Sequence, residues 1–309
     1  LKAKRKHYFL QSLENRFYKE NDICRDLFFL TLFTNYNIFT EANWISRWVK
    51  DSLRINATVV PNGIDLDLFR EEPDLKNRNR RLRVLIEGPF SIFYKGVEDC
   101  FKVVNDLEVE VWYVTSEDIE IPSIYRVDKK FVKTPFKKMY EIYNQCDILL
   151  KMSKVEGVFG PPLEMMACGG TCVVGNVSGY DEYCVHEENC LVVDMNSIED
   201  AKNAIVRLDN DRELLEKLRK NALKTPLKFN WNDSIKILNE KVFVKEYVEN
   251  EELIKNNNFY QVDFEKSMNS ILAEFEKKEI EINEYDNSLR LSFKQREKKQ
   301  KKIEEYDKN

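Results

Sequence analysis

The most informative stretch of this sequence covers residues 155–194 and reads VEGVFGPPLEMMACGGTCVVGNVSGYDEYCVHEENCLVVD. It contains two glutamates eight positions apart, Glu156 and Glu164, with a loop rich in glycine and proline between them. The apolar run 163–167 predicts a short helix, because prolines stand at its start and two glycines follow its end. The segment 171–175, TCVVG, predicts a strand.

A further predicted strand, residues 147–151, comes directly before this loop. The order strand, loop, helix, strand predicts a βαβ unit. The loop then lies at the carboxyl end of the first strand, where α/β sheets bind ligands. The amino terminus of a helix at that place carries partial positive charge and free N–H groups, which suit a phosphate.

A second βαβ unit is predicted earlier, with strands at 82–87 and 109–115, a loop at 88–94 and a helix at 96–107. Lys95 stands at the start of this helix, where a lysine opposes the helix dipole, so we expect it to serve an anion. The other predicted elements are strands at 7–10, 36–40 and 131–134, a helical stretch around 26–30, and helices at 43–53, 137–146, 198–208 and 212–224.

The signature residues Glu156 and Glu164 lie within EGVFGPPLEMMACGG and are followed by Gly179, Glu182 and CLVVD. This pattern resembles the donor site of retaining GT-B glycosyltransferases of family 4, the glycosyl transferases group 1. The chain is thus similar to rhamnosyl-, mannosyl- and glucosyltransferases of that family. VPNGID, near residue 62, resembles the hinge-side loop of the same enzymes.

The resemblance implies an α/β fold of the GT-B type, with a Rossmann-like donor-binding domain at residues 82–228. Residues 1–69 are then the last part of an acceptor-binding, Rossmann-like domain, and residues 70–81 are a charged linker. Residues 229–262 form a helix that crosses back to the first domain, and a linker. An imperfect apolar register at 263–309 predicts a helical tail, either a coiled coil or a single solvated helix. Because the chain begins with Leu1, we expect a fragment.

The resemblance also implies residue roles. Glu156 lies beside the transferred sugar and Lys95 binds the donor diphosphate, and these two carry the catalysis. Glu164 accepts hydrogen bonds from both ribose hydroxyls, which a carboxylate can do in a bidentate contact. The resemblance favours retention by front-face attack, while a covalent intermediate on Glu156 is the alternative. The other donor-binding residues are Gly88, Ser153, Gly157, Val158, Phe159, Gly160 and Pro161.

One departure from the family pattern concerns the diphosphate. Pro89 stands where relatives have an arginine for this group. Lys95 is then left to neutralise the diphosphate alone, or with help from Arg83 or Lys151.

A second departure concerns the acceptor. Gln11 stands where many relatives have a histidine near the transferred sugar, so Gln11 and Glu14 are the residues assigned to the acceptor side. His7 is interpreted as structural.

Composition limits the function classes. Hydrophobic residues make up 43% and charged residues 33% of the 309 residues, which is typical of a soluble globular protein. A net charge of −5 argues against a nucleic-acid binder. With no signal peptide and no apolar run of about 18 residues, we expect a cytoplasmic protein, and the acceptor class suggests attachment to the inner face of the membrane.

Metal ligands are scarce in the sequence. Seven cysteines without a CxxC pair and two histidines argue against zinc and favour reduced thiols. Asp65 and Asp67 offer a D-x-D pair, but a turn capped by an aspartate is the favoured interpretation. The resemblance implies neither a metal nor another cofactor.

Two functions remain open at this stage. The first is a glycosyltransferase that moves a sugar from a nucleoside diphosphate sugar to a glycan or a lipid-linked acceptor in surface polysaccharide synthesis. The second is a degenerate nucleotide-sugar-binding scaffold that no longer transfers. In both, the helical tail is a candidate for self-association or a partner. The base, the sugar and the acceptor do not follow from the sequence.

Overall fold

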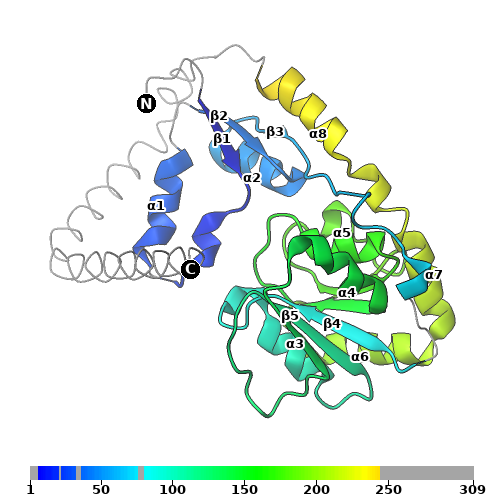
Figure 1. Ribbon diagram of the computed structural model, residues 1–309. Helices are drawn as coiled ribbons and strands as arrows, with labels where there is room; N and C mark the ends of the chain where they lie inside the picture. Colours follow the sequence, from blue (N-terminus) through cyan, green and yellow to red (C-terminus); the bar gives the residue numbers. More distant parts are fainter. Residues whose placement is uncertain (1–5, 21, 33–35, 76–79, 244–309) are drawn as a thin grey trace, which may run out of the picture. The chain divides into compact units, whose positions relative to one another are not determined.

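The computed structural model describes residues 6–20, 22–32, 36–75 and 80–243, which fall within one compact unit spanning residues 1–247 (Figure 1). Two separate parallel sheets organise these residues. The predicted tail at 263–309 lies outside the described residues.

The smaller sheet has the strand order β1-β2-β3. Its strands are β1 (His7–Leu10), β2 (Asn37–Thr40) and β3 (Thr58–Val59), with helices α1 (Ile23–Leu32) and α2 (Asn43–Leu53) and a 3-10 turn, η1 (Glu14–Phe17). Ile45 and Val49 of α2 pack with Leu10 and Ile38 of the strands in one buried cluster. Ile45 and Val49 therefore form the inward face of α2.

The larger sheet has six parallel strands in the order β6-β5-β4-β7-β8-β9. This order reverses direction between β4 and β7, as in doubly wound nucleotide-binding folds. Its strands are β4 (Arg83–Glu87), β5 (Glu110–Thr115), β6 (Lys129–Val132), β7 (Ile148–Lys151), β8 (Thr171–Gly175) and β9 (Leu191–Val193).

Helices cover both faces of this sheet, because successive strand residues point to opposite sides. Leu149 packs with α4 (Met139–Gln145) and α5 (Gly160–Ala167), whereas Ile148 and Leu150 pack with α3 (Val97–Val104) and α6 (Ile198–Asn210). Figure 1 shows α4 and α5 on one side of the strands and α3 and α6 on the other. α7 (Arg212–Ala222) contributes to both clusters.

The predicted fold class is thus confirmed. The strands β3 and β9 were not predicted, and the other errors lie at element boundaries. β6 begins at Lys129 and ends at Val132 instead of spanning 131–134, because Lys133 has a φ of 51° that ends the extended chain. α3 stops at Val104 because a turn follows, in which the N–H of Leu107 donates to the Val104 carbonyl. α4 begins at Met139 instead of residue 137, after a 3-10 turn, η4 (Phe136–Lys138).

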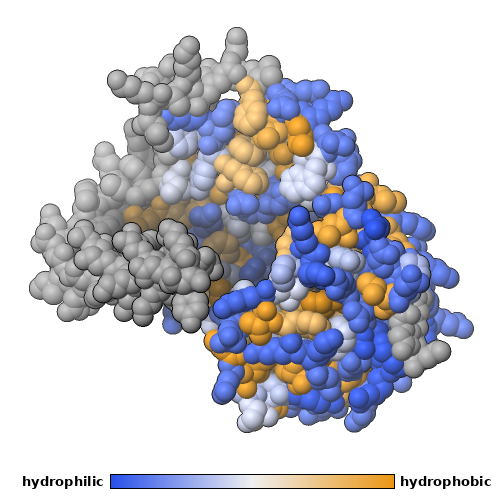
Figure 2. Space-filling model, in the orientation of Figure 1, coloured by the Kyte–Doolittle hydropathy of each residue, from blue (hydrophilic) through white to orange (hydrophobic). Residues whose placement is uncertain are grey.

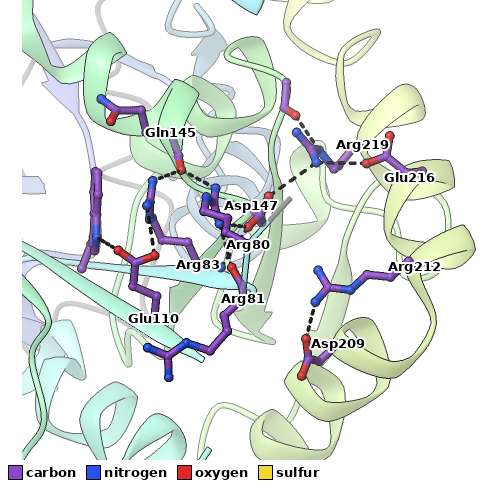
Figure 3. Close-up of polar contacts among 12 residues, drawn as sticks. Arg80, Arg81, Arg83, Glu110, Gln145, Asp147, Asp209, Arg212, Glu216 and Arg219 are labelled. Atoms are coloured by element: carbon purple, nitrogen blue, oxygen red, sulfur yellow. Dashed lines mark hydrogen bonds and ion pairs between the residues drawn. The ribbon is translucent and has the colours of Figure 1, made fainter. Parts of the chain in front are cut away.

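A buried ionic network closes the end of the larger sheet where β4 and β7 begin (Figure 3). Asp147 accepts hydrogen bonds from Arg80 Nη1 at 2.6 Å and from the Arg83 backbone N–H at 2.9 Å. Arg219 Nη1 lies 3.5 Å from the other Asp147 oxygen. The Arg83 guanidinium forms an ion pair with Glu110 at 3.0 Å. Arg80 therefore fastens the end of the charged segment 70–81 to the sheet.

The last described segment runs beside the smaller sheet. It includes a 3-10 turn, η6 (Pro226–Lys228), then α8 (Trp231–Ile237) and a π-helical turn, η7 (Leu238–Val242). Another 3-10 turn, η2 (Pro73–Leu75), lies earlier in the chain. Ser234 Oγ donates to the Pro61 carbonyl at 2.5 Å, and the Ile64 N–H donates to the Phe229 carbonyl at 2.9 Å. A side chain at Gly63 would overlap Trp231, so glycine is needed for this contact.

Exposed hydrophobic side chains are dispersed over the described surface. They include Phe93, Phe136, Leu227 and Ile235, each more than half exposed. Figure 2 shows hydrophilic and hydrophobic residues intermingled on one face of the molecule. Among the residues that the structure describes, none of the helices has the length and apolar character needed to span a membrane.

Candidate functional site

The carboxyl ends of β4 and β7 lie side by side, because these two strands pair directly. β4 ends at Glu87 and β7 ends at Lys151. The chain leads from β4 to α3 on one face of the sheet and from β7 to α5 on the other. The region outside these two strand ends, called the crevice below, is the usual ligand site of a doubly wound sheet.

Two lysines converge on Glu156 in this crevice. Lys95 Nζ lies 3.0 Å from Oε2 and 3.2 Å from Oε1 of Glu156, and Lys151 Nζ lies 3.6 Å from Oε1. Lys151 is 4% exposed and Glu156 9% exposed, whereas the Lys95 side chain is 27% exposed. Lys95, Lys151 and Glu156 together carry a formal charge of +1, which favours the binding of an anion next to the partly exposed Lys95.

The loop that carries Lys95 is held against the loop after β7. Gly96 has a φ of 62°, and a side chain there would overlap the carbonyl oxygen of Met152. The Lys154 N–H donates to the Tyr94 carbonyl at 2.8 Å. Buried Ser153 lies with its Oγ 3.4 Å from the Lys95 carbonyl oxygen, at the edge of hydrogen-bonding distance. This close approach places Lys95 beside Glu156.

Helix α5 starts in the same crevice and has prolines at its first positions, as predicted. Pro161 and Pro162 have no N–H, so they remove two of the donors that a helix amino terminus usually offers an anion. The lysines must therefore supply more of the neutralisation than the helix does. Gly160 leaves the side of the helix open next to Glu164, whose Oε1 would lie 3.9 Å from a Cβ at that glycine.

Glu164 belongs to a group of three polar side chains. The Tyr143 hydroxyl lies 2.6 Å from Glu87 Oε2 and 3.0 Å from Glu164 Oε2. Burial raises the pKa of Glu164 to about 7, and the nearby charge of Glu87 adds to this effect. Burial also raises the pKa of Glu87. Sequence reasoning missed Glu87 and Tyr143, although Glu87 is a charged residue directly after the apolar run 84–86.

The loop after Glu156 also contacts the smaller sheet. Trp44 Nε1 donates to the Gly157 carbonyl at 2.8 Å, and a side chain at Gly157 would overlap the Gln11 carbonyl oxygen. Gly179, with a φ of 87°, packs against the same carbonyl of Gly157. Gln11 is therefore brought to the signature loop.

Glu182, in the 3-10 turn η5 (Tyr180–Glu182) after β8, forms hydrogen bonds to helix α2. Its carboxylate accepts hydrogen bonds from the Trp44 backbone N–H at 2.9 Å and from Asn43 Nδ2 at 2.7 Å. It thereby caps α2, whose own cap residue, Ala42, offers no side-chain acceptor. The predicted signature included Glu182, but its capping role became apparent only in the fold.

Glu41 is a buried carboxyl that sequence reasoning did not single out. It follows β2 and accepts a hydrogen bond from Asn62 Nδ2 at 2.6 Å. It is 7% exposed, and burial raises its pKa to about 7, with a contribution from the charge of Glu156. The backbone of Val158 and the side chain of Gln11 also hydrogen-bond to it. Glu41 is thus a titratable group between the two sheets.

A cavity of about 760 Å³ opens between the smaller sheet and α5. Its aromatic lining includes Phe9, Phe39, Phe69, Phe136 and Trp231. Its lining also contains the predicted residues Gln11, Val158, Phe159, Gly160 and Glu164. Asp65 and Glu164 supply the carboxylates of this lining, which has no lysine or arginine.

The remaining predicted residues fall in different places. Gly88, with a φ of 140°, ends β4 at the crevice. Glu14 is exposed on η1 and does not line the cavity. Of the two cations considered as helpers of Lys95, Lys151 lies at the site, whereas Arg83 lies at the far end of β4.

The D-x-D pair forms a turn. Asp65 Oδ1 accepts hydrogen bonds from the N–H groups of Asp67 and Leu68, each at 3.1 Å, as expected for an aspartate-capped turn. In the described part of the chain, no three acidic, histidine or cysteine side chains come together in a way that would hold a metal ion. Six of the seven cysteines are buried, and burial raises the pKa of Cys100 to about 12.

Comparison with known proteins points to one enzyme class. Residues 129–225 match the family described as "Glycosyl transferases group 1". The chain is 23% identical over 224 residues to an uncharacterised glycosyltransferase of Methanocaldococcus jannaschii. The aligned region covers 70% of this chain and 62% of the relative. A second uncharacterised glycosyltransferase of that organism is 27% identical over 160 residues, covering 46% and 40%. The chain thus spans about three fifths or less of the length of these relatives.

Solved structures share the fold. A sucrose-phosphate synthase from Thermosynechococcus elongatus superposes with a TM-score of 0.65 at 19% identity, over 74% of this chain and 65% of that one. Anabaena HepE, solved in complex with UDP-glucose, superposes with a TM-score of 0.64 at 15% identity, over 76% and 71%. The GT-B type of α/β fold is therefore shared with known glycosyltransferases.

Proposed function

We propose that this chain carries the donor site of a retaining glycosyltransferase. The enzyme would move a sugar from a nucleoside diphosphate sugar to a glycan or a lipid-linked acceptor in surface polysaccharide synthesis. The observation that carries the proposal is the convergence of Lys95 and Lys151 on Glu156 at the switch point of the sheet. The family match over residues 129–225 supports it.

The leaving diphosphate requires positive charge, because negative charge develops on it as the sugar departs. Lys95 is partly exposed and can turn from Glu156 to a phosphate oxygen. Lys151 supplies a second cation from the neighbouring strand. This buried lysine can replace the arginine that relatives have at the position of Pro89.

The residues that would bind the nucleoside and the sugar lie on either side of the proposed diphosphate position. Glu164 would accept hydrogen bonds from the ribose hydroxyls beside the open surface of Gly160. Glu156, released from Lys95 when a donor enters, would accept hydrogen bonds from the sugar and stabilise positive character at its anomeric carbon. The acceptor would approach from the side of Gln11.

Metal independence follows from this arrangement as part of the proposal. The two lysines would neutralise the charge that a divalent cation neutralises in other transferases. With front-face attack, a phosphate oxygen of the leaving group would take the proton of the acceptor hydroxyl, and the sugar would keep its anomeric configuration. We further propose that the enzyme works in the cytoplasm at the inner face of the membrane.

The test is calorimetric titration with UDP, GDP, UDP-glucose and GDP-mannose, each with and without EDTA. We expect one nucleotide pair to bind with micromolar affinity, unchanged by EDTA. The matched control is Lys138→Met, since Lys138 is a largely exposed lysine paired with Glu141 away from the crevice. Lys95→Met should weaken binding at least tenfold and Lys138→Met should not, because a phosphate contact to a charged group contributes about 1.5–3 kcal/mol.

Slow hydrolysis of the bound donor tests retention. From an α-linked nucleotide sugar, proton NMR should show the α-anomer as the first sugar released. Release of the β-anomer would contradict retention. Binding without any transfer or hydrolysis would favour the degenerate scaffold, which the replacements at Pro89 and Gln11 would then explain. No binding at all would contradict the donor site in this chain.

A further inference from the structure

Tyr143 lies between Glu87 and Glu164, and its hydroxyl contacts both carboxyls but has only one proton to donate. Its hydroxyl lies 2.6 Å from one carboxyl and 3.0 Å from the other, yet it has a single hydrogen to donate. Tyr143 keeps that hydrogen, because burial holds its pKa well above the usual range. The second contact is a hydrogen bond only if one of the two carboxyls carries a proton and donates it to the tyrosine oxygen.

Glu87, Tyr143 and Glu164 form a chain of hydrogen bonds, and its direction decides whether Glu164 can accept further hydrogen bonds. If Glu87 holds the proton, Glu87 donates to Tyr143, Tyr143 donates to Glu164, and Glu164 remains an ionised acceptor. If Glu164 holds the proton, the chain runs in reverse and Glu164 becomes a poor acceptor for a ribose diol. Only the first direction suits the ribose role of Glu164.

The surroundings of Glu87 connect it to the diphosphate as well. The charges of Lys151 and Lys95 stabilise ionised Glu87, while the charge of Glu156 opposes it. Glu164 faces Tyr143, Glu87 and Lys151, and shares its cavity with Asp65. An ionised Glu87 would therefore compete with the diphosphate for the two lysines. A protonated Glu87 leaves both lysines to the donor.

We propose that Glu87 is a positioning residue of the donor site, which holds a proton and acts through Tyr143 to keep Glu164 ionised for the ribose. This inference rests on the proposed function, since it assigns Glu164 to the ribose and the lysines to the diphosphate. Neither Glu87 nor Tyr143 belongs to the glutamate signature from which the donor site was predicted.

Proton uptake on donor binding follows. Burial already raises the pKa of Glu87 in the empty site, and a diphosphate near the same lysines adds negative charge that raises it further. Molecules in which Glu87 is ionised therefore gain a proton when the donor binds. Affinity therefore falls as the pH rises, by at most about tenfold per pH unit for one linked proton.

The experiment is calorimetric titration with UDP-glucose and with GDP-mannose between pH 6.5 and 8.5, in buffers of different ionisation enthalpy. Nucleotide sugars are used because their diphosphate has no ionisation in this range. For the wild type we expect net proton uptake towards the alkaline end of this range and an affinity that weakens as the pH rises.

The decisive variant is Glu87→Gln, because glutamine reproduces the shape and the N–H donor of the protonated acid without titrating. We expect it to take up less proton than the wild type on donor binding, and its affinity to fall less as the pH rises. Tyr143→Phe breaks the hydrogen-bond chain to Glu164, so the double variant Glu87→Gln/Tyr143→Phe should bind the donor more weakly than Glu87→Gln alone. Thermal unfolding of each variant separates loss of fold from loss of binding.

Three results would overturn the inference. Wild-type binding without proton uptake would show that Glu87 holds no linked proton, while leaving the donor site itself in place. The same proton uptake in Glu87→Gln would assign the proton to another group. Absence of binding by either nucleotide sugar to any of the proteins would overturn the proposed function and this inference together.

Discussion

Asp147 offers the sharpest test of what holds the larger sheet together, by the change Asp147→Asn. One carboxylate oxygen accepts from Arg80 and from the Arg83 N–H, and the other faces Arg219 (Figure 3). The side chains of Asp147 and Arg219 are 8% and 5% exposed. An amide would place an NH₂ group against guanidinium donors and remove the negative charge that Asp147 presents to Arg80 and Arg219.

The free-energy cost is estimated from this burial. Removing one partner of a buried ion pair destabilises a protein by about 3–5 kcal/mol. Asparagine keeps one oxygen as an acceptor and Arg80 retains some solvent, so we expect the lower end, about 3 kcal/mol. For a chain of this size that corresponds to a decrease in Tm of about 6–12 °C.

The matched control is Asp209→Asn, which removes the same charge from an exposed pair with Arg212 in the same region of the molecule. Surface pairs contribute about 0–1 kcal/mol, so its Tm should fall by no more than about 4 °C. Thermal unfolding followed by circular dichroism measures the Tm of both variants, and urea denaturation measures their free energy of unfolding. Equal effects of the two changes would refute the burial reasoning. Nucleotide affinity should stay unchanged in both, because the network lies at the end of β4 opposite Glu87.

Four further outcomes are expected. Glu164→Ala should weaken donor binding by about 1–3 kcal/mol, the contribution of hydrogen bonds to a charged group; an unchanged affinity in calorimetry would refute the ribose role. The raised pKa of Glu41, about 7 in the folded chain against 4.5 in the unfolded one, means that its contribution to stability is present at acid pH and lost as the pH rises to 7. Glu41→Gln should therefore unfold at higher urea concentration than the wild type at pH 8 but not at pH 4.5, and a pH-independent difference would contradict this. Gly157→Ala should lower the Tm, because its methyl group would overlap the Gln11 carbonyl; an unchanged Tm would show that the loop can move away. Removing residues 263–309 should leave the Tm unchanged and reduce any oligomer mass in light scattering, and aggregation of the shortened chain would instead show that these residues cover the core.

Much of the fold could be predicted from local patterns. The strands at 82–87, 109–115 and 171–175 are apolar runs bounded by turn residues, and the structure confirms them to within one residue. The boundaries of β6 and α4 were wrong because a left-handed Lys133 and a 3-10 turn are decided by packing that leaves little trace in composition.

The site was predictable only where the chain carries a linear pattern. Glu156 and Glu164 belong to a signature within one segment, and Lys95 stands next to a glycine at the start of a helix. Glu87, Tyr143 and Glu41 come from three separate parts of the chain, so no spacing in the sequence indicates that they lie at the site. Lys151 was considered a helper of Lys95 but could be placed only once β4 and β7 were seen to pair.

The most direct test of the donor site is a crystal structure of this chain with a bound nucleotide sugar. We predict that the Lys95 and Lys151 ammonium groups contact the diphosphate, that Glu156 turns from Lys95 to the sugar, and that the ribose hydroxyls lie on Glu164. A nucleotide bound elsewhere, with the Lys95–Glu156 ion pair intact, would contradict the proposed function.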